Sequence, residues 1–181
     1  TWEFDESTKQ YYFHLFSKKQ PDLNWENPDV RQAVFEMMNW WFEKGIDGFR
    51  VDAITHIKKN FEAGDLPVPD GKKFAPAFDV DMNQPGIQEW LQEMKDKSLS
   101  RYDIMTVGEA NGVTPNDAEE WVGEENGKFN MIFQFEHLGL WSTGDTKFDV
   151  KSYKQVLNRW QKQLENVGWN ALFIENHDQP R

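Results

Sequence analysis

Three acidic side chains in this sequence could do chemistry together, because each one follows a short apolar run. The acids are Asp52, Glu109 and Asp178. An apolar run of this length is typical of a buried strand, so each acid is predicted where its strand leaves a sheet at the carboxyl end. The predicted strands cover residues 46–51, 104–108 and 171–175. Ligands of parallel sheets bind at those ends, which makes the three acids candidates for one site.

A basic residue accompanies the first acid. Alternate side chains of a strand share a face, so Arg50 and Asp52 point the same way. A nearby positive charge favours the ionised carboxylate, which suits a nucleophile or an electrostatic stabiliser. The alternative is a buried Arg–Asp pair that only fixes strand register, and this stretch alone leaves both open.

Together with an arginine and a histidine, the three acids form a candidate catalytic constellation. In (β/α) barrels the catalytic groups come from the carboxyl ends of several strands. A pair of carboxyl groups can divide catalytic work when one is ionised and the other holds its proton. Glu109 follows an apolar strand and lies near Asp52, so desolvation and that negative charge are expected to raise its proton affinity.

Helical patterns alternate with the predicted strands. Asn27 and Pro28 form the N-cap and first turn of a helix that Gly45 would end. Further helices are predicted over 85–97, from Thr114 and over 149–167, and another strand over 130–135. This alternation predicts parallel, right-handed βαβ units. The fold class is therefore α/β, and the four strands are about half of a (β/α)8 TIM barrel.

Two stretches have no clear periodicity. Residues 1–26 are aromatic and irregular, and 57–83 are rich in turn-forming Pro and Gly. Asp79 and Asp81 resemble a metal-binding fragment, but no third ligand stands at a helpful spacing. A solvated loop is the prediction there.

Composition limits the partners. The net charge of −11 argues against nucleic acid and anionic membranes, and no run approaches the 18 or so apolar residues of a membrane span. The chain has no cysteine, which is compatible with a reducing cytosol, and a cytoplasmic location is predicted. A barrel typically needs about 250 residues, so 181 residues predict an internal piece of a longer protein.

Four motifs resemble the signature regions of one enzyme family. They are Gln20-Pro21-Asp22-Leu23-Asn24, Gly48-Phe49-Arg50-Val51-Asp52, Val107-Gly108-Glu109-Ala110 and Glu175-Asn176-His177-Asp178. Together, and in this order, they resemble the alpha-amylase family of glycoside hydrolases (glycoside hydrolase family 13). The residues around 133–137 and 176–181 are closer to its oligo-1,6-glucosidase and alpha-glucosidase branch.

The resemblance implies a domain organisation. Residues 1–26 would be the C-terminal part of an inserted subdomain, called subdomain B. Residues 27–181 would be a partial catalytic barrel, matching about its fourth to seventh strands. No metal or other cofactor is expected in this chain, whereas a calcium or magnesium site is possible in the upstream part of such a protein.

The resemblance also implies roles for the site residues. Asp52 would be the nucleophile, Glu109 the acid/base and Asp178 a third acid that stabilises the distorted sugar ring. Substrate-binding candidates are Arg50, His56, His177 and Arg181, with binding and packing both open for His56. Phe133, Phe135, His137 and Trp141 could line a pocket or belong to the core.

The implied function is a retaining alpha-glucosidase acting on short oligosaccharides of the maltose or isomaltose type. A small residue after the nucleophile, here Ala53, goes with preference for α-1,4 over α-1,6 linkages in this branch. An oligo-1,6-glucosidase, a trehalose-6-phosphate hydrolase or another relative with the same acids stays open. A non-catalytic binding relative is disfavoured because such proteins lose the acids. The isolated chain is expected to be inactive.

Overall fold

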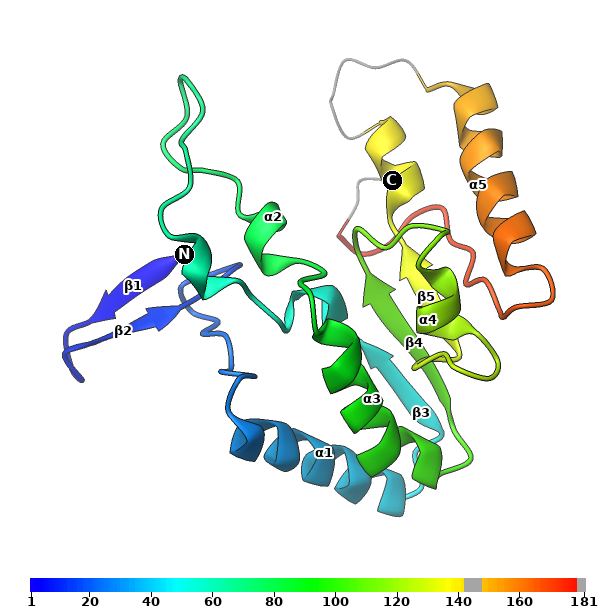
Figure 1. The fold of residues 1–181 in the computed structure, drawn as a ribbon, viewed down its shortest axis with the longest axis horizontal. Coiled ribbons are helices and arrows are strands. Elements are labelled where there is room, and N and C mark those ends of the chain that lie inside the picture. Colours follow the sequence, from blue (N-terminus) through cyan, green and yellow to red (C-terminus); the bar gives the residue numbers. More distant parts are fainter. Residues whose placement is uncertain (142–147, 179–181) are drawn as a thin grey trace.

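The centre of the fold is a three-stranded parallel sheet in the order β3–β4–β5 (Figure 1). The computed structural model describes residues 1–141 and 148–178. The strands are β3 (Gly48–Val51), β4 (Met105–Ala110) and β5 (Met131–Gln134). Gly48 pairs with Met105, and Val107 pairs with Met131. Because all three strands run the same way, their carboxyl ends lie at one edge of the sheet.

Helices connect successive strands, as predicted for βαβ units. The α-helices are α1 (Pro28–Glu43), α2 (Phe78–Asp81), α3 (Ile87–Lys97), α4 (Ala118–Val122) and α5 (Val150–Leu164). Short 3-10 helices are η1 (Ile54–His56), η2 (Phe61–Ala63), η3 (Leu99–Arg101) and η4 (Glu136–Leu140). Helix α1 contacts α3, and α4 contacts both β5 and α5.

The core lies where these helices meet the sheet. Phe35 of α1, Leu91 of α3 and Trp160 of α5 have no exposed side-chain surface. Complete burial of an apolar side chain of this size contributes about 1.5–3 kcal/mol. These contacts hold the helices against the sheet and so fix where the strand ends point.

The predicted helix ends of α1 are confirmed. The Asn27 side chain accepts a hydrogen bond from the backbone N–H of Asp29, and Pro28 occupies the first turn. At the other end Gly45 has a φ of 91°. This left-handed conformation is costly for residues with a Cβ atom, which is why glycine ends the helix.

Helix α5 is shorter than the predicted range 149–167. Asp149 is its N-cap: its carboxylate accepts from Ser152 Oγ at 2.6 Å and from the backbone N–H groups of Lys151 and Ser152. These bonds, the hydroxyl bond most of all, hold the pKa of Asp149 below its usual range. The buried stripe consists of Val156, Trp160 and Leu164.

The prediction of a strand over 171–175 is wrong, because the structure has no strand there. A strand exists only where its backbone bonds to a neighbour, and 171–175 has no ladder with β5 in the described part of the chain. The side chains of this segment still alternate between buried and exposed, as in a strand: Ala171 is buried, whereas Leu172 and Ile174 are 63% and 68% exposed. These two apolar side chains indicate a face that this chain does not cover.

Aromatic contacts, rather than β-ladder hydrogen bonds, hold the segment 171–174 against the rest of the fold. The Phe173 ring lies 5.3 Å from Phe133, 5.8 Å from Phe135 and 4.7 Å from His137 between ring centroids. His137 is completely buried, and this burial lowers its pKa. The aromatic residues after β5 thus pack against the segment that leads to Asp178.

Two other predicted boundaries move. Strand β4 continues through Glu109 to Ala110 because Glu109 pairs with Phe133 of β5, so the acid lies within the strand. The helix predicted from Thr114 begins at Ala118. The backbone N–H and Oγ1 of Thr114 donate to Asp117 Oδ2, so the predicted capping pair closes a turn before the helix.

Both stretches predicted as irregular contain regular elements. Strands β1 (Trp2–Asp5) and β2 (Gln10–Phe13) form an antiparallel hairpin with Trp2 opposite Phe13. This hairpin stands apart from the main sheet (Figure 1). Asp81, predicted in a solvated loop, ends α2 and is 1% exposed, because the α2 turn packs against η1.

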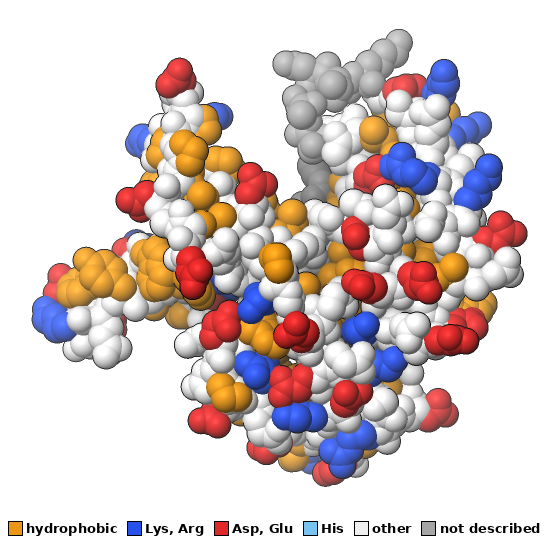
Figure 2. All heavy atoms as spheres, viewed as in Figure 1, with side chains coloured by type: hydrophobic (Ala, Val, Ile, Leu, Met, Phe, Trp, Pro, Cys, Tyr) orange, Lys and Arg blue, Asp and Glu red, His pale blue; other side chains and the backbone are white. Residues whose placement is uncertain are grey.

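Lys/Arg and Asp/Glu side chains are interspersed over one face of the molecule (Figure 2). Across residues 1–141 and 148–178, every helix is too short or too polar to cross a membrane.

Candidate active site

Strands β3 and β4 bring two of the predicted catalytic acids together. Val51 pairs with Gly108, so Asp52 and Glu109 follow at the same level of the sheet. The guanidinium of Arg50 contacts both: Nη1 donates to Asp52 Oδ1, and Nη2 donates to Glu109 Oε2. Arg50 therefore holds both carboxyl groups rather than only the nearer one.

The two carboxyl groups have different environments. The side chain of Asp52 is 73% exposed and that of Glu109 is 13% exposed. Burial raises the pKa of Glu109, and a hydrogen bond to Asp52 and the charges of Asp52 and Asp178 raise it further, against the opposing charge of Arg50. Burial and the nearby negative charges thus favour the protonated form of Glu109, whereas the carboxyl group of Asp52 is open to solvent.

Asp178 belongs to the same electrostatic cluster, since its charge acts on Glu109. Its backbone N–H donates to Asn176 Oδ1 at 3.0 Å, and its Oδ2 lies 3.2 Å from His177 Nε2. The side chains of His177 and Asp178 are both largely exposed, so both are accessible to a ligand.

The remaining substrate-binding candidates are placed differently. Arg181 lies outside the described residues. His56 is 7% exposed, and its Nδ1 lies 3.0 Å from the backbone carbonyl oxygen of Asp81. The rings of Phe16 and Phe78 each lie 6.0 Å from the His56 ring. His56 is packed within the protein, four residues along the chain from Asp52.

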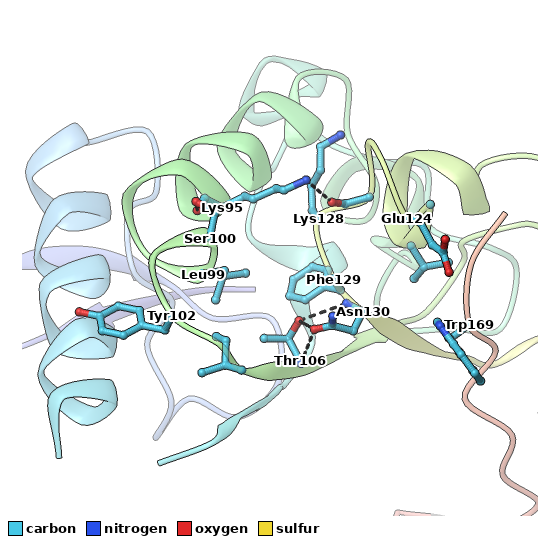
Figure 3. Close-up of a pocket in the computed structure, with 14 residues that line it drawn as sticks. Lys95, Leu99, Ser100, Tyr102, Thr106, Glu124, Lys128, Phe129, Asn130 and Trp169 are labelled. Atoms are coloured by element: carbon cyan, nitrogen blue, oxygen red, sulfur yellow. Dashed lines mark hydrogen bonds between the residues drawn. The ribbon is translucent and has the colours of Figure 1, made fainter. Parts of the chain in front are cut away.

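Two cavities lie at opposite ends of the sheet. One of about 550 Å³ follows the carboxyl ends of β4 and β5 and includes Asn111, Phe135 and Glu136 in its lining. The other, of about 320 Å³, lies beside Thr106 and Asn130 where β4 and β5 begin (Figure 3). The lining of these two cavities includes none of Asp52, Glu109 and Asp178, so the acids lie outside both.

No group of three or more His, Cys, Asp or Glu in residues 1–141 and 148–178 is arranged to hold a metal ion.

Comparison with known proteins decides the family. Residues 1–181 match the family model of the alpha-amylase catalytic domain. The chain belongs to the alpha-amylase family. Its parallel sheet with connecting helices is accordingly part of the (β/α)8 barrel of these glycoside hydrolases, as the sequence predicted.

Two similar proteins of the alpha-amylase family are named as oligo-1,6-glucosidases. The chain is 60% identical over 181 residues to the probable oligo-1,6-glucosidase 3 of Bacillus subtilis, covering 99% of this chain and 33% of the relative. It is 51% identical over 185 residues to the oligo-1,6-glucosidase of Parageobacillus thermoglucosidasius, with the same coverage. A crystal structure of Bacillus licheniformis trehalose-6-phosphate hydrolase is 41% identical, with a TM-score of 0.83 over 99% of this chain and 32% of that chain. The chain thus spans about a third of the length of these proteins.

Two features of this alpha-amylase-family site were missed at the sequence level. One is the contact from Arg50 to Glu109, because nothing in either segment indicates that β3 and β4 pair in this register. The other is the buried turn around Asp81, whose carboxylate oxygens have no hydrogen-bond partner among the described residues. The only local signal for it was the Asp79–Asp81 pattern.

Proposed function

We propose that the full-length protein is a retaining alpha-glucosidase that releases glucose from short α-linked oligosaccharides. The observation that carries this proposal is the pair Asp52 and Glu109 held by Arg50, with the pKa of Glu109 raised by burial. A retaining glycosidase needs this combination of an accessible carboxylate and a protonated acid. The names of the relatives support an α-linked glucoside as substrate.

The proposed reaction has two steps. An Asp52 oxygen attacks the anomeric carbon, the glycosidic C–O bond breaks, and Glu109 gives its proton to the leaving oxygen. Water then attacks the glycosyl ester while Glu109 takes a proton from it, which releases glucose and restores both carboxyl groups. Asp178 would bind the sugar ring hydroxyls and stabilise the distorted ring.

Four other side chains are candidates for contact with the sugars. Arg50 and His177 lie beside the acids. Arg181 stays a proposal from its position in the chain. For His56, which is 7% exposed, packing and binding both stay open. We also infer that residues 1–26 are the end of an inserted subdomain and residues 27–181 a partial barrel, which the separate hairpin in Figure 1 supports. A cytoplasmic location stays a prediction from the sequence.

The stereochemistry of the released sugar tests the mechanism. Proton NMR of p-nitrophenyl α-glucoside hydrolysis by the full-length protein is expected to show α-glucose first and β-glucose only after mutarotation. Initial release of β-glucose would mean direct attack by water and would contradict the nucleophile role of Asp52.

The preferred linkage has two candidates. Ala53 favours α-1,4 by the resemblance described above, whereas the names of the two relatives favour α-1,6. A trehalose-6-phosphate substrate is a third candidate, supported by the solved structure. Rates on maltose, isomaltose and trehalose-6-phosphate separate the three.

Replacing Ala53 by Val is expected to lower the kcat/KM ratio of maltose to isomaltose, because the added methyl groups crowd the sugar that leaves. Ala53 has a φ of 43°, where a β-branched residue is strained, so both rates should also fall together. Ala53→Gly is the control, since it tolerates this conformation and adds no methyl group. The same ratio in the wild type, Ala53→Val and Ala53→Gly would show that Ala53 has no role in linkage choice.

The pH dependence of kcat/KM is expected to reflect the raised pKa of Glu109. The protonated form is the active acid, so activity should be lost as the pH rises through that pKa. Asp178 raises this pKa through its charge. In Asp178→Asn the residual activity should therefore decline at a lower pH than in the wild type. The control Glu175→Gln removes a nearby exposed charge and should leave the high-pH decline of kcat/KM where it is in the wild type. If the decline is also unchanged in Asp178→Asn, Asp178 does not raise the pKa of Glu109.

A further inference from the structure

Two short loops follow the proposed catalytic acids. The 3-10 helix η1 follows Asp52, and the turn at Asn111 and Gly112 follows Glu109. The first loop packs on strand β4: a Cβ added to Gly108 would lie 3.3 Å from Ile54 Cγ2. Ile54 is 1% exposed, so η1 is seated directly on the strand residue that precedes Glu109.

A single residue from a third segment connects the two loops. Asn83 lies in the turn between α2 and α3. Its backbone N–H donates to the carbonyl oxygen of Thr55 at 2.8 Å, and its side-chain Nδ2 donates to the carbonyl oxygen of Asn111 at 3.0 Å. Thr55 lies three residues after Asp52, and Asn111 lies two residues after Glu109.

The turn that carries Asn83 is itself held in place. Gln84 Nε2 donates to the carbonyl oxygens of Asp79 at 2.9 Å and Met82 at 3.1 Å. His56 Nδ1 lies 3.0 Å from the carbonyl oxygen of Asp81, and because a carbonyl only accepts, this nitrogen is the donor. The turn therefore binds η1 at both Thr55 and His56.

Gly112 packs against this turn so closely that a Cβ atom there would displace the turn's side chains. A Cβ at Gly112 would lie 2.6 Å from Met82 Cε and 2.9 Å from Asn83 Nδ2. Asn83 has a φ of 51°, a left-handed conformation that asparagine adopts more readily than most residues. Position 83 thus needs a residue that adopts the left-handed backbone conformation and that also carries a side-chain N–H donor as long as that of asparagine.

We propose that Asn83 is a positioning residue that sets the location of Glu109 relative to Asp52, a role that rests on the proposed function. Asn83 contacts neither acid in the described structure. It acts through the backbone of the loops that follow them. A displacement of about 1 Å between reacting groups can cost about 100-fold in rate, so a connection this close to both acids is expected to affect catalysis.

The variant Asn83→Gly isolates the side-chain bond. Glycine accepts the left-handed conformation and keeps the N–H that donates to Thr55, so only the connection to Asn111 is lost. Asn39→Gly is the matched control: Asn39 is also half-buried, and its Nδ2 donates to the carbonyl oxygen of Lys97 at 3.2 Å, between α1 and the end of α3. Glycine inside helix α1 also lowers stability, so this control is at least as perturbing to the fold.

Two substrates distinguish a misplaced acid from a general loss. Hydrolysis of maltose or isomaltose needs a proton from Glu109, whereas 2,4-dinitrophenyl α-glucoside has a leaving group that departs without one. In the full-length protein, Asn83→Gly is expected to lower kcat/KM on the disaccharide by about tenfold to 100-fold. On the aryl glucoside kcat/KM, which reports only formation of the glycosyl ester, should fall by less than about threefold. Asn83→Asp, which keeps the size but not the donor, should show the same selectivity, and thermal unfolding verifies that each variant is folded.

Equal losses on both substrates, or a loss no greater than that of Asn39→Gly, would overturn the positioning role while leaving the proposed function in place. If the wild-type protein hydrolyses none of these glucosides, the proposed function fails and the positioning role fails with it.

Discussion

Replacing Asp52 by Asn in the full-length protein is expected to lower kcat on maltose or isomaltose by about 10⁴-fold or more. An amide oxygen is a much weaker nucleophile than a carboxylate and cannot form the glycosyl ester. The substitution also removes the negative charge that raises the pKa of Glu109, so the remaining acid should deprotonate at a lower pH. Both effects reduce the rate in the same direction.

Asp47→Asn is the matched control for this variant. Asp47 precedes β3 at the opposite end from Asp52 and is exposed. Its backbone carbonyl accepts from Met105 N–H, and this bond does not depend on the side chain. Steady-state kinetics should show near wild-type turnover for Asp47→Asn. Retention of more than about a hundredth of the activity in Asp52→Asn would assign the nucleophile to another group.

The isolated 181-residue chain is expected to show no measurable glucosidase activity, although it carries all three acids. Orientation of reacting groups contributes about 7–11 kcal/mol to well-arranged reactions. The described residues form three parallel strands, fewer than the eight of a closed barrel. A substrate would therefore be held from one side only.

The environment of Glu109 gives a second reason to expect that the isolated chain is inactive. Its raised pKa depends first on burial, and an open sheet admits water to the strand ends. Water stabilises the ionised carboxylate, so the pKa of Glu109, already raised in this chain by burial, should rise further in a closed barrel. Glu109 should therefore protonate the leaving group less well in the isolated chain than in the full-length protein. Leu172 and Ile174, exposed on the segment before Asp178, would also leave that acid poorly fixed.

Assays of the purified chain and the full-length protein on p-nitrophenyl α-glucoside test this expectation side by side. The full-length protein should be active and the chain inactive at equal molar concentration. Turnover by the chain that disappears in its own Asp52→Asn variant would show that these residues suffice for catalysis.

Local chemistry in the sequence determined much of the fold. Asn27, Pro28 and Gly45 define the ends of α1 through capping and backbone preference, which depend on a few adjacent residues. Apolar runs identified β3, β4 and β5, and the acids after the predicted strands 46–51, 104–108 and 171–175 indicated a common site. Four short motifs together were specific enough to indicate the family that the comparisons then showed.

Tertiary structure decided the properties that depend on residues distant in the sequence. The segment 171–175 has the pattern of a strand but no ladder, because hydrogen bonding needs a neighbour at the right distance and register. The same pairing geometry brings Arg50 to Glu109, and packing buries Glu109 and so raises its pKa. Asn83 joins the loops after both acids, although its sequence neighbourhood indicates only a turn. Spacing in the chain determines which residues are available, whereas contact and burial, which set their chemistry, arise only when distant segments pack together.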